Sequence, residues 1–184
     1  MDTLTHALSG ALVGRVLAGR RAQTATAQPP VWQMVAAGTV AATFPDLDFV
    51  LGWVSELTYL RGHRGVTHSL VLLPLWGLMI AWLLARFWQR GGRAGAGWRS
   101  FYLVVCSAIF VHIVGDLITQ HVPMILSPFS DRRFGWGTTF IIDLPFTGII
   151  LAGLVVSALW RSSRVPAATA LVLLAGWVGV QAVG

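Results

Sequence analysis

The segment His63-Arg64-Gly65-Val66-Thr67-His68-Ser69 places two imidazoles, a guanidinium and two hydroxyls within seven residues. Such groups can bind metal ions, transfer protons or hold anions. A long apolar run follows directly, where polar residues are scarce. Two interpretations are open: a solvated loop whose Thr67 or Ser69 caps the next helix, or one wall of a metal site. His68, at the start of the apolar run, favours the metal site.

His112 and Asp116 lie four residues apart inside another apolar run. On a helix this spacing puts both side chains on one face. A charged group near the bilayer centre costs roughly 2.5–3.5 kcal/mol on insertion scales, so each residue needs a partner or a wet cavity. The pair suits two ligands to one metal ion, and it suits equally a buried His–Asp hydrogen bond that braces the helices.

Asp46 and Asp48 follow a proline at position 45. Proline removes a backbone donor and disfavours α geometry at Phe44, so we expect the helix to stop or bend there. In an extended segment, residues two apart point to the same side, which would align the two carboxylates for a hard or borderline cation. An aspartate after proline is also a common helix cap or turn residue.

Further ionisable residues carry weaker signals. Asp131, Arg132 and Arg133 form a charge run that is solvated if it stands alone, but beside a metal site the arginines could hold a phosphate or carboxylate. Asp143 lies within an apolar run and therefore requires an interior partner. His6, near the start of the chain, is either a ligand or a hydrogen-bonding residue at a helix end.

The composition places these residues in a membrane protein. Hydrophobic residues make up 55% of the 184 positions, charged residues make up 11%, and the mean hydropathy is +0.71. The net charge of +6 comes from arginines between apolar runs, which favours orientation in the bilayer over nucleic-acid binding. The single Cys106 excludes an intramolecular disulfide and is interpreted as a small core residue.

Six apolar segments approach the roughly 20 residues that cross a bilayer as helix, the first of them short. We therefore predict an all-α, polytopic membrane bundle of about six helices, forming a single transmembrane domain over residues 1–184. A glycine- and arginine-rich loop at 86–99 is expected to be flexible, and polar loops at 55–66 and 127–137 are expected to border the site. The segments are residues 4–18, 31–54, 66–88, 100–126, 138–160 and 165–183.

The arginine distribution predicts an orientation. Nine arginines lie in the loops after the odd-numbered segments and four after the even-numbered ones, which puts the N-terminus on the non-cytoplasmic side. With six spans in sequence, all five histidines and all seven acids then fall in the same, outer half of the bundle. We accordingly expect the site near the non-cytoplasmic face. The nine are Arg15, Arg20, Arg21, Arg86, Arg90, Arg93, Arg99, Arg161 and Arg164.

Taken together, several stretches resemble the membrane-bound metal-dependent hydrolase family of bacterial inner membranes (YdjM-type, with a LexA-regulated best-known member). They run in order from residue 1 to about 150: MDTLTHA at the start, FPDLD at 44–48, HRGVTHS at 63–69, HIVGD at 112–116, SPFSDRR at 127–133 and FIID at 140–143. The resemblance implies a metal-dependent hydrolase of the inner membrane. Its implied ligands are His6, Asp46, Asp48, His63, His68, His112 and Asp116.

The leading functional hypothesis is an integral membrane hydrolase acting on a lipid-like phosphoester or ester. Mixed imidazole and carboxylate ligands suit zinc first, then manganese or iron, and so many ligands leave room for one or two ions. Asp143 or Asp131 would act as general base or orient a ligand histidine, and Arg64, Arg132 and Arg133 would hold an anionic amphipathic substrate. The alternatives are a metal-ion or proton transporter, and a non-catalytic stress-response factor with a structural His/Asp cluster. A transporter would need ionisable groups along a path through both halves of the bundle, and the inner half has none beyond its loop arginines.

Overall fold

The computed structural model describes residues 1–18, 29–90 and 96–183, and all regular structure in these ranges is helical. The prediction of an all-α helical fold with a short first helix is confirmed. Arg20, Arg21 and Arg93 lie outside the described residues. The elements are α1 (Thr3–Leu17), α2 (Val31–Thr43), the 3₁₀ segment η1 (Pro45–Trp53), α3 (Glu56–Gly62), the 3₁₀ turn η2 (Val66–His68), α4 (Leu73–Arg90), α5 (Trp98–Ile118), α6 (Leu144–Leu159) and α7 (Val165–Val183).

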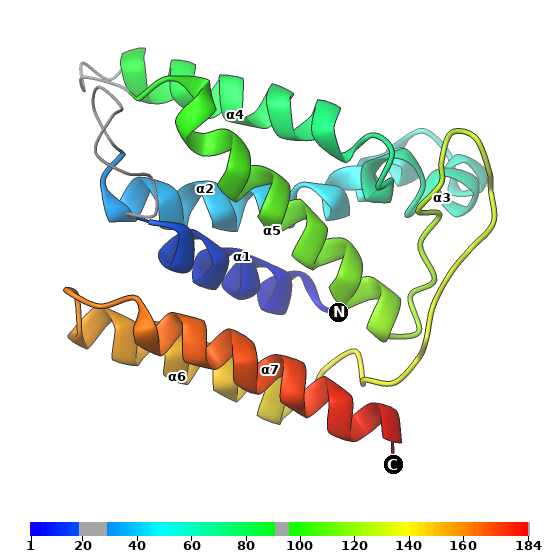
Figure 1. Cartoon of the computed structure of the whole chain (residues 1–184). Coiled ribbons are helices and arrows are strands. Elements are labelled where there is room, and N and C mark those ends of the chain that lie inside the picture. The colour runs from blue at the N-terminus through cyan, green and yellow to red at the C-terminus, as the bar shows by residue number, and fades with distance from the viewer. Residues whose placement is uncertain (19–28, 91–95, 184) are drawn as a thin grey trace.

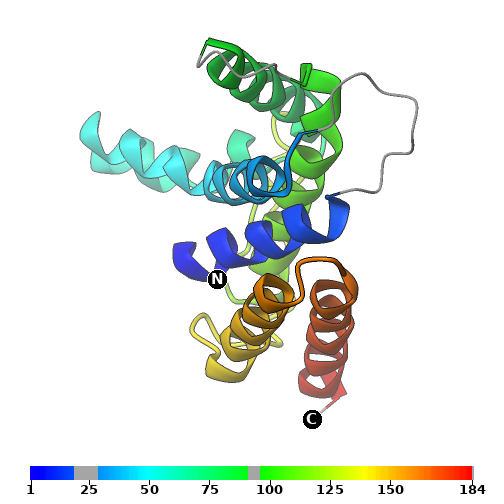
Figure 2. The same cartoon turned by 90° about the vertical axis from the view of Figure 1, so that its left-hand side faces the viewer.

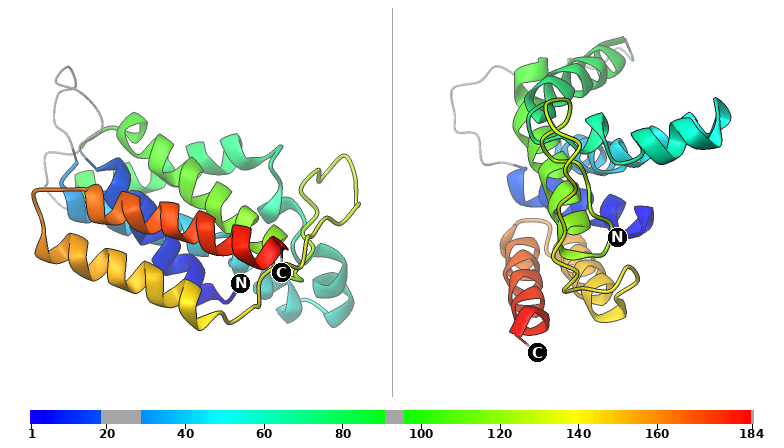
Figure 3. Two further views of the ribbon diagram at one scale, coloured as in Figure 1. Left: turned by 60° about the horizontal axis from the view of Figure 1, so that its bottom comes forward. Right: turned by 90° about the vertical axis from the view of Figure 1, so that its right-hand side faces the viewer.

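The long helices run side by side, and successive long helices point in opposite directions along the bundle (Figure 1). Helices α1, α2 and α5 form the centre, α4 packs on α5, and the α6/α7 pair packs against α1 (Figure 2). The N-terminal ends of α1 and α6 and the C-terminal ends of α2 and α5 therefore share one end of the molecule (Figure 3). That end carries the acids and histidines singled out above.

Three glycines allow α1 and α2 to cross closely. A methyl group added at Gly10 or Gly38 would collide with the backbone carbonyl of the other residue, and one added at Gly14 would collide with the backbone of Met34. Small residues let helix backbones approach in this way in membrane proteins. The close crossing places the N-terminal turn of α1 beside the end of α2.

The chain bends at Pro45, as its position predicts. Helix α2 ends at Thr43, and η1 continues at an angle of 45° to it. The expectation of an extended segment for Asp46 and Asp48 is wrong, because both lie in 3₁₀ geometry. With three residues per turn, side chains two apart point in different directions, so the two carboxylates diverge.

Several predicted boundaries also shift. Helix α4 continues to Arg90 and α5 begins at Trp98, so helix occupies both ends of the predicted 86–99 loop, and positions 91–95 lie outside the described residues. Arginine and glutamine propagate helix well, and Arg86, Gln89 and Arg90 therefore favour the extension. The 55–66 loop contains α3, whereas 127–137 carries no regular structure. Helix α6 begins only at Leu144, because Asp143 caps it.

Two described helices, α5 and α7, are long and apolar enough to cross a membrane, and α2 with η1 forms a third candidate if the bent pair is one span. Helix α6 is apolar but shorter. These helices support the prediction that the chain is a membrane protein. Six crossings remain a prediction.

Candidate metal centre

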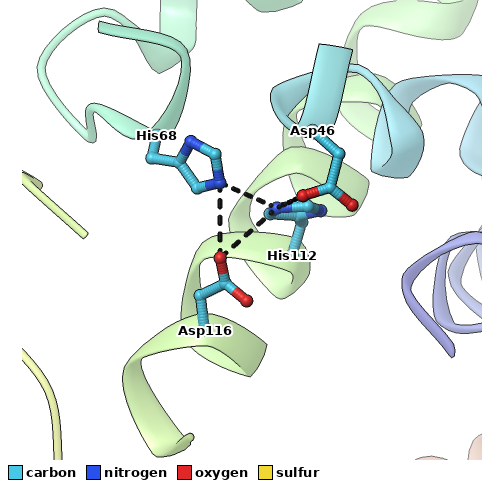
Figure 4. Close-up of side chains that lie close together, drawn as sticks. All are labelled: Asp46, His68, His112 and Asp116. Atoms are coloured by element: carbon cyan, nitrogen blue, oxygen red, sulfur yellow. Dashed lines mark hydrogen bonds and ion pairs between the residues drawn. The ribbon is translucent and has the colours of Figure 1, made fainter. Parts of the chain in front are cut away.

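Two histidines and two aspartates converge at the shared end of the bundle (Figure 4). Asp46 comes from η1, His68 from η2, and His112 and Asp116 from successive turns of α5. Each offers one nitrogen or oxygen, and these four atoms all lie within 4.8 Å of one another. His68, His112 and Asp116 are fully buried, while Asp46 is partly exposed.

The distances within the group match a four-coordinate ion. The Nε2 atoms of His68 and His112 are 3.1 Å apart, and His68 Nε2 is 3.3 Å from Asp116 Oδ2. His112 Nε2 is 3.7 Å from Asp46 Oδ1 and 3.8 Å from Asp116 Oδ2. Ligands held about 2.0–2.1 Å from a tetrahedral zinc ion are separated from each other by roughly 3.3 Å. The donor set therefore fits such an ion in its chemistry, and these four separations lie near that value within a group that spans up to 4.8 Å.

Asp116 carries the clearest sign of a missing partner. Its Oδ1 accepts from His6 Nε2 at 3.1 Å and from the Met1 amine at 2.6 Å, but its buried Oδ2 has no hydrogen-bond partner among the described residues. The Nε atom of Arg64 is also buried without such a partner and lies 3.6 Å from this oxygen. An unsatisfied buried carboxylate oxygen is costly, so this atom fits a metal ligand.

Each of the four side chains is oriented by a neighbour, as metal ligands are in known sites. His112 Nδ1 donates to the Ala42 carbonyl at 2.6 Å, which leaves the Nε2 lone pair free to face the group. Thr3 Oγ1 donates to Asp46 Oδ2 at 2.7 Å. His6, besides bonding Asp116, stacks its ring on His112 with centroids 3.7 Å apart.

Asp48 anchors the segment that carries His68. Its Oδ1 lies 2.9 Å from His63 Nδ1, and its Oδ2 accepts from the Arg64 backbone amide at 2.7 Å and from Thr67 Oγ1 at 3.4 Å. The same oxygen lies 3.8 Å from His68 Nδ1. Asp48 and His63 thus contact the site from outside the group of four, and so does His6.

Arg64 alone among the predicted catalytic residues lies within the site. It is buried, with its Nε beside Asp116 and its Nη1 donating to the His121 carbonyl at 3.1 Å. Burial and the positive charges of the Met1 amine and Arg64 lower the pKa of His121 to about 4. The His121 imidazole is therefore neutral at pH 7 and adds no charge.

The other four predicted catalytic residues have different surroundings. Asp131, Arg132 and Arg133 are exposed in the 127–137 loop, where Arg132 lies over the ring of Phe134. Asp143 caps α6 through the Phe146 amide, and its carboxylate also accepts from Trp177 and Gln181 of α7. Among the described residues, no hydrogen bond or ion pair joins any of these four to the metal group.

Four residues that bind predicted site residues carried no clear sequence signal. Thr3 is a hydroxyl residue at the start of a helix, a position where such residues are common as caps. The Ala42 carbonyl carries no side-chain signal, although a helix ending before proline frees its last carbonyls. Trp177 and Gln181 lie in α7, whose segment contains no ionisable residue. The only cue was that Asp143 needed a partner.

These features define a helical membrane protein with a buried His/Asp centre near one end of its bundle. Residues 1–184 match the YdjM inner membrane protein family, and the chain belongs to that family. It is 28% identical over 180 residues to the uncharacterized protein YfhP of Bacillus subtilis (strain 168), an alignment that covers 97% of this chain and 52% of YfhP. The chain thus spans about half the length of that relative. No solved structure matches the chain.

Proposed function

We propose that the protein is a metal-dependent hydrolase that cleaves a phosphoester or ester of a membrane lipid-like substrate. The observation that carries the proposal is the convergence of two imidazole nitrogens and two carboxylate oxygens from three segments, with Asp116 Oδ2 buried and otherwise unsatisfied. A purely structural cluster has no need to leave that oxygen without a donor.

The ligand set favours zinc, with manganese or iron as the next candidates. Asp46, His68, His112 and Asp116 would hold the ion, since two imidazoles with two carboxylates suit borderline metals better than calcium or magnesium. The described residues contain one such group, which supports one ion more directly than two. When bound, the ion supplies a Lewis acid that polarises an ester or phosphoester oxygen and lowers the pKa of water.

The chain's own residues supply anion binding and orientation. The buried Nε of Arg64 lies next to Asp116 without a hydrogen-bond partner among the described residues, so the guanidinium can donate to the oxygens of a phosphate or carboxylate group. His6 and Asp48 keep Asp116 and His68 in place through the contacts described above. The position of Arg64 supports it as the substrate-binding arginine in preference to the exposed Arg132 and Arg133.

The first test is metal content. Full-length protein purified in detergent without chelators should contain about one equivalent of transition metal by elemental analysis. His112→Ala should lose it, because that variant removes a ligand, whereas His121→Ala should retain it as a matched control. Metal-free wild-type protein would overturn the proposal.

The second test is hydrolysis. The metal-loaded protein should release alcohol or phosphate from one class in a panel of long-chain alkyl phosphates, phosphodiesters and carboxylic esters. The activity should disappear on chelation and in His68→Ala. Metal binding without turnover of any member would argue for the structural alternative.

We also propose a multi-pass inner-membrane protein with the centre near the non-cytoplasmic face, on the support of the arginine distribution. Single cysteines can test this in a Cys106→Ser background. Arg132→Cys, in the exposed loop at the site's end of the bundle, should react with a membrane-impermeant maleimide added outside spheroplasts. Arg90→Cys, exposed at the opposite end, should not. The reverse pattern would invert the orientation.

A further inference from the structure

A cavity lies next to the candidate metal centre, where His6 and Gly115 form part of its lining. It has a volume of about 420 Å³ and is lined by residues of α1, α5, the start of α6 and α7, together with Met1 and Trp136. Its walls are mostly aliphatic, formed on α5 by Val111 and Val114 and on α7 by Leu171, Leu174 and Val178. Small-molecule sites commonly have volumes of roughly 300–1,000 Å³ and apolar walls.

The inner end of this cavity is His6. The His6 ring stacks on His112 and donates from Nε2 to Asp116, so a single side chain separates the cavity from the metal group. Gly115 keeps this end open, since an added methyl group would lie 3.1 Å from His6 Cε1.

The outer wall is formed by α7, which is long and apolar enough to cross the bilayer. Along the cavity, Leu174 is buried, Leu171 and Val178 are half-buried, and Ala175 is exposed. The cavity therefore adjoins the side of the bundle that faces lipid chains. Water is a poor occupant, because the aliphatic walls offer it few hydrogen-bond partners.

We propose that this cavity binds the alkyl chain of the substrate, with the polar head at the His6 end of the cavity, beside the metal centre. This assignment rests on the proposed hydrolase function. The occupant follows from the aliphatic walls and the adjoining lipid-facing helix. The protein would then act on amphipathic molecules that enter sideways from the bilayer, and a short-chain ester would bind poorly.

The test is photo-crosslinking of the full chain in detergent with dodecyl phosphate that carries a diazirine near the end of its chain. We expect adducts on the α5 and α7 residues of the cavity. Unlabelled dodecyl phosphate should suppress them, and butyl phosphate should not. Ala175→Phe should lower labelling about tenfold by filling the space. Val172→Phe, on the exposed face of the same helix, should leave labelling unchanged.

The outcomes separate this inference from the proposed function. Labelling that is scattered over lipid-facing residues, or that is unchanged in Ala175→Phe, would overturn the cavity assignment even if metal is bound. Cavity labelling that persists in protein found to lack metal would support the chain site while the hydrolase proposal fails. For an active enzyme, Ala175→Phe should raise KM for dodecyl substrates about tenfold and leave metal content unchanged.

Discussion

His112 Nδ1 lies 2.6 Å from the carbonyl oxygen of Ala42, in a helix that ends one residue later at Thr43. The last carbonyls of a helix have no intrahelical donor, so this one is free to accept from a side chain of α5. The break before Pro45 thus has a chemical role. The free Ala42 carbonyl fixes the His112 tautomer and leaves Nε2 facing Asp46. The same break determines the position of Asp46, which lies directly after Pro45.

The first prediction concerns Pro45→Ala. An amide at position 45 would let α2 continue, and the residue-46 amide would then compete with His112 for the Ala42 carbonyl. Loss of an orienting contact of this kind typically costs 10–100-fold in metal affinity, so we expect a fall of roughly that size. Competition with a fluorescent chelator measures it. Pro166→Ala, in the first turn of α7, is the control, and equal affinities in the two variants would contradict the idea.

The second prediction separates ligands from supporting residues. Asp46→Asn should weaken metal binding more than Asp48→Asn, because Asp46 faces His112 whereas Asp48 anchors His63 and the Arg64 amide. We expect about 10–100-fold for Asp48→Asn and a larger loss for Asp46→Asn. Both affinities can be obtained from the same chelator titration. A larger effect at Asp48 would make it a direct ligand.

The third prediction concerns anion binding by Arg64. Arg64→Gln should retain metal but bind inorganic phosphate about 10–100-fold more weakly, since hydrogen bonds to charged groups contribute roughly 1.5–3 kcal/mol. Phosphate affinity of the metal-loaded protein can be measured by calorimetry. Arg132→Gln and Arg133→Gln, both exposed, serve as controls and should change it little. If the loop variants lose phosphate binding and Arg64→Gln keeps it, the assignment is reversed.

The fourth prediction concerns Asp143. Burial raises the pKa of Asp143, but hydrogen bonds from the Phe146 amide, Trp177 and Gln181 outweigh burial and hold the pKa below its usual range. Its stabilising effect is therefore present above about pH 4 and is lost as the pH falls through the lowered pKa of the folded state. Asp143→Ala should cost about 1–2 kcal/mol at pH 7, with metal content unchanged.

Thermal unfolding in detergent as a function of pH measures this effect. The melting-temperature gap between wild type and Asp143→Ala should narrow in acid, and Asp131→Ala, at an exposed position, should show no gap. If hydrolysis is lost in Asp143→Ala while its melting temperature is unchanged, the residue would be a general base after all.

The sequence by itself determined the helical membrane class, the bend at Pro45 and the residue types of the site. These follow from local physics: apolar runs of bilayer length, the missing proline amide, and the cost of an unpartnered charge in a helix. The i, i+4 spacing of His112 and Asp116 was sufficient to place them on one face, and the structure retains that relationship.

Only the tertiary structure decided which of seven proposed ligands form one group. Asp46 and Asp48 are two residues apart, yet the 3₁₀ geometry of η1 sends one toward His112 and the other toward His63. The Asp143 carboxylate accepts hydrogen bonds from Trp177 and Gln181 of α7. The hydrophobic periodicity of the sequence does not predict these partners, because they depend on how α6 and α7 pack. Backbone conformation and helix packing set the directions of side chains, and a linear pattern of residue types does not contain them.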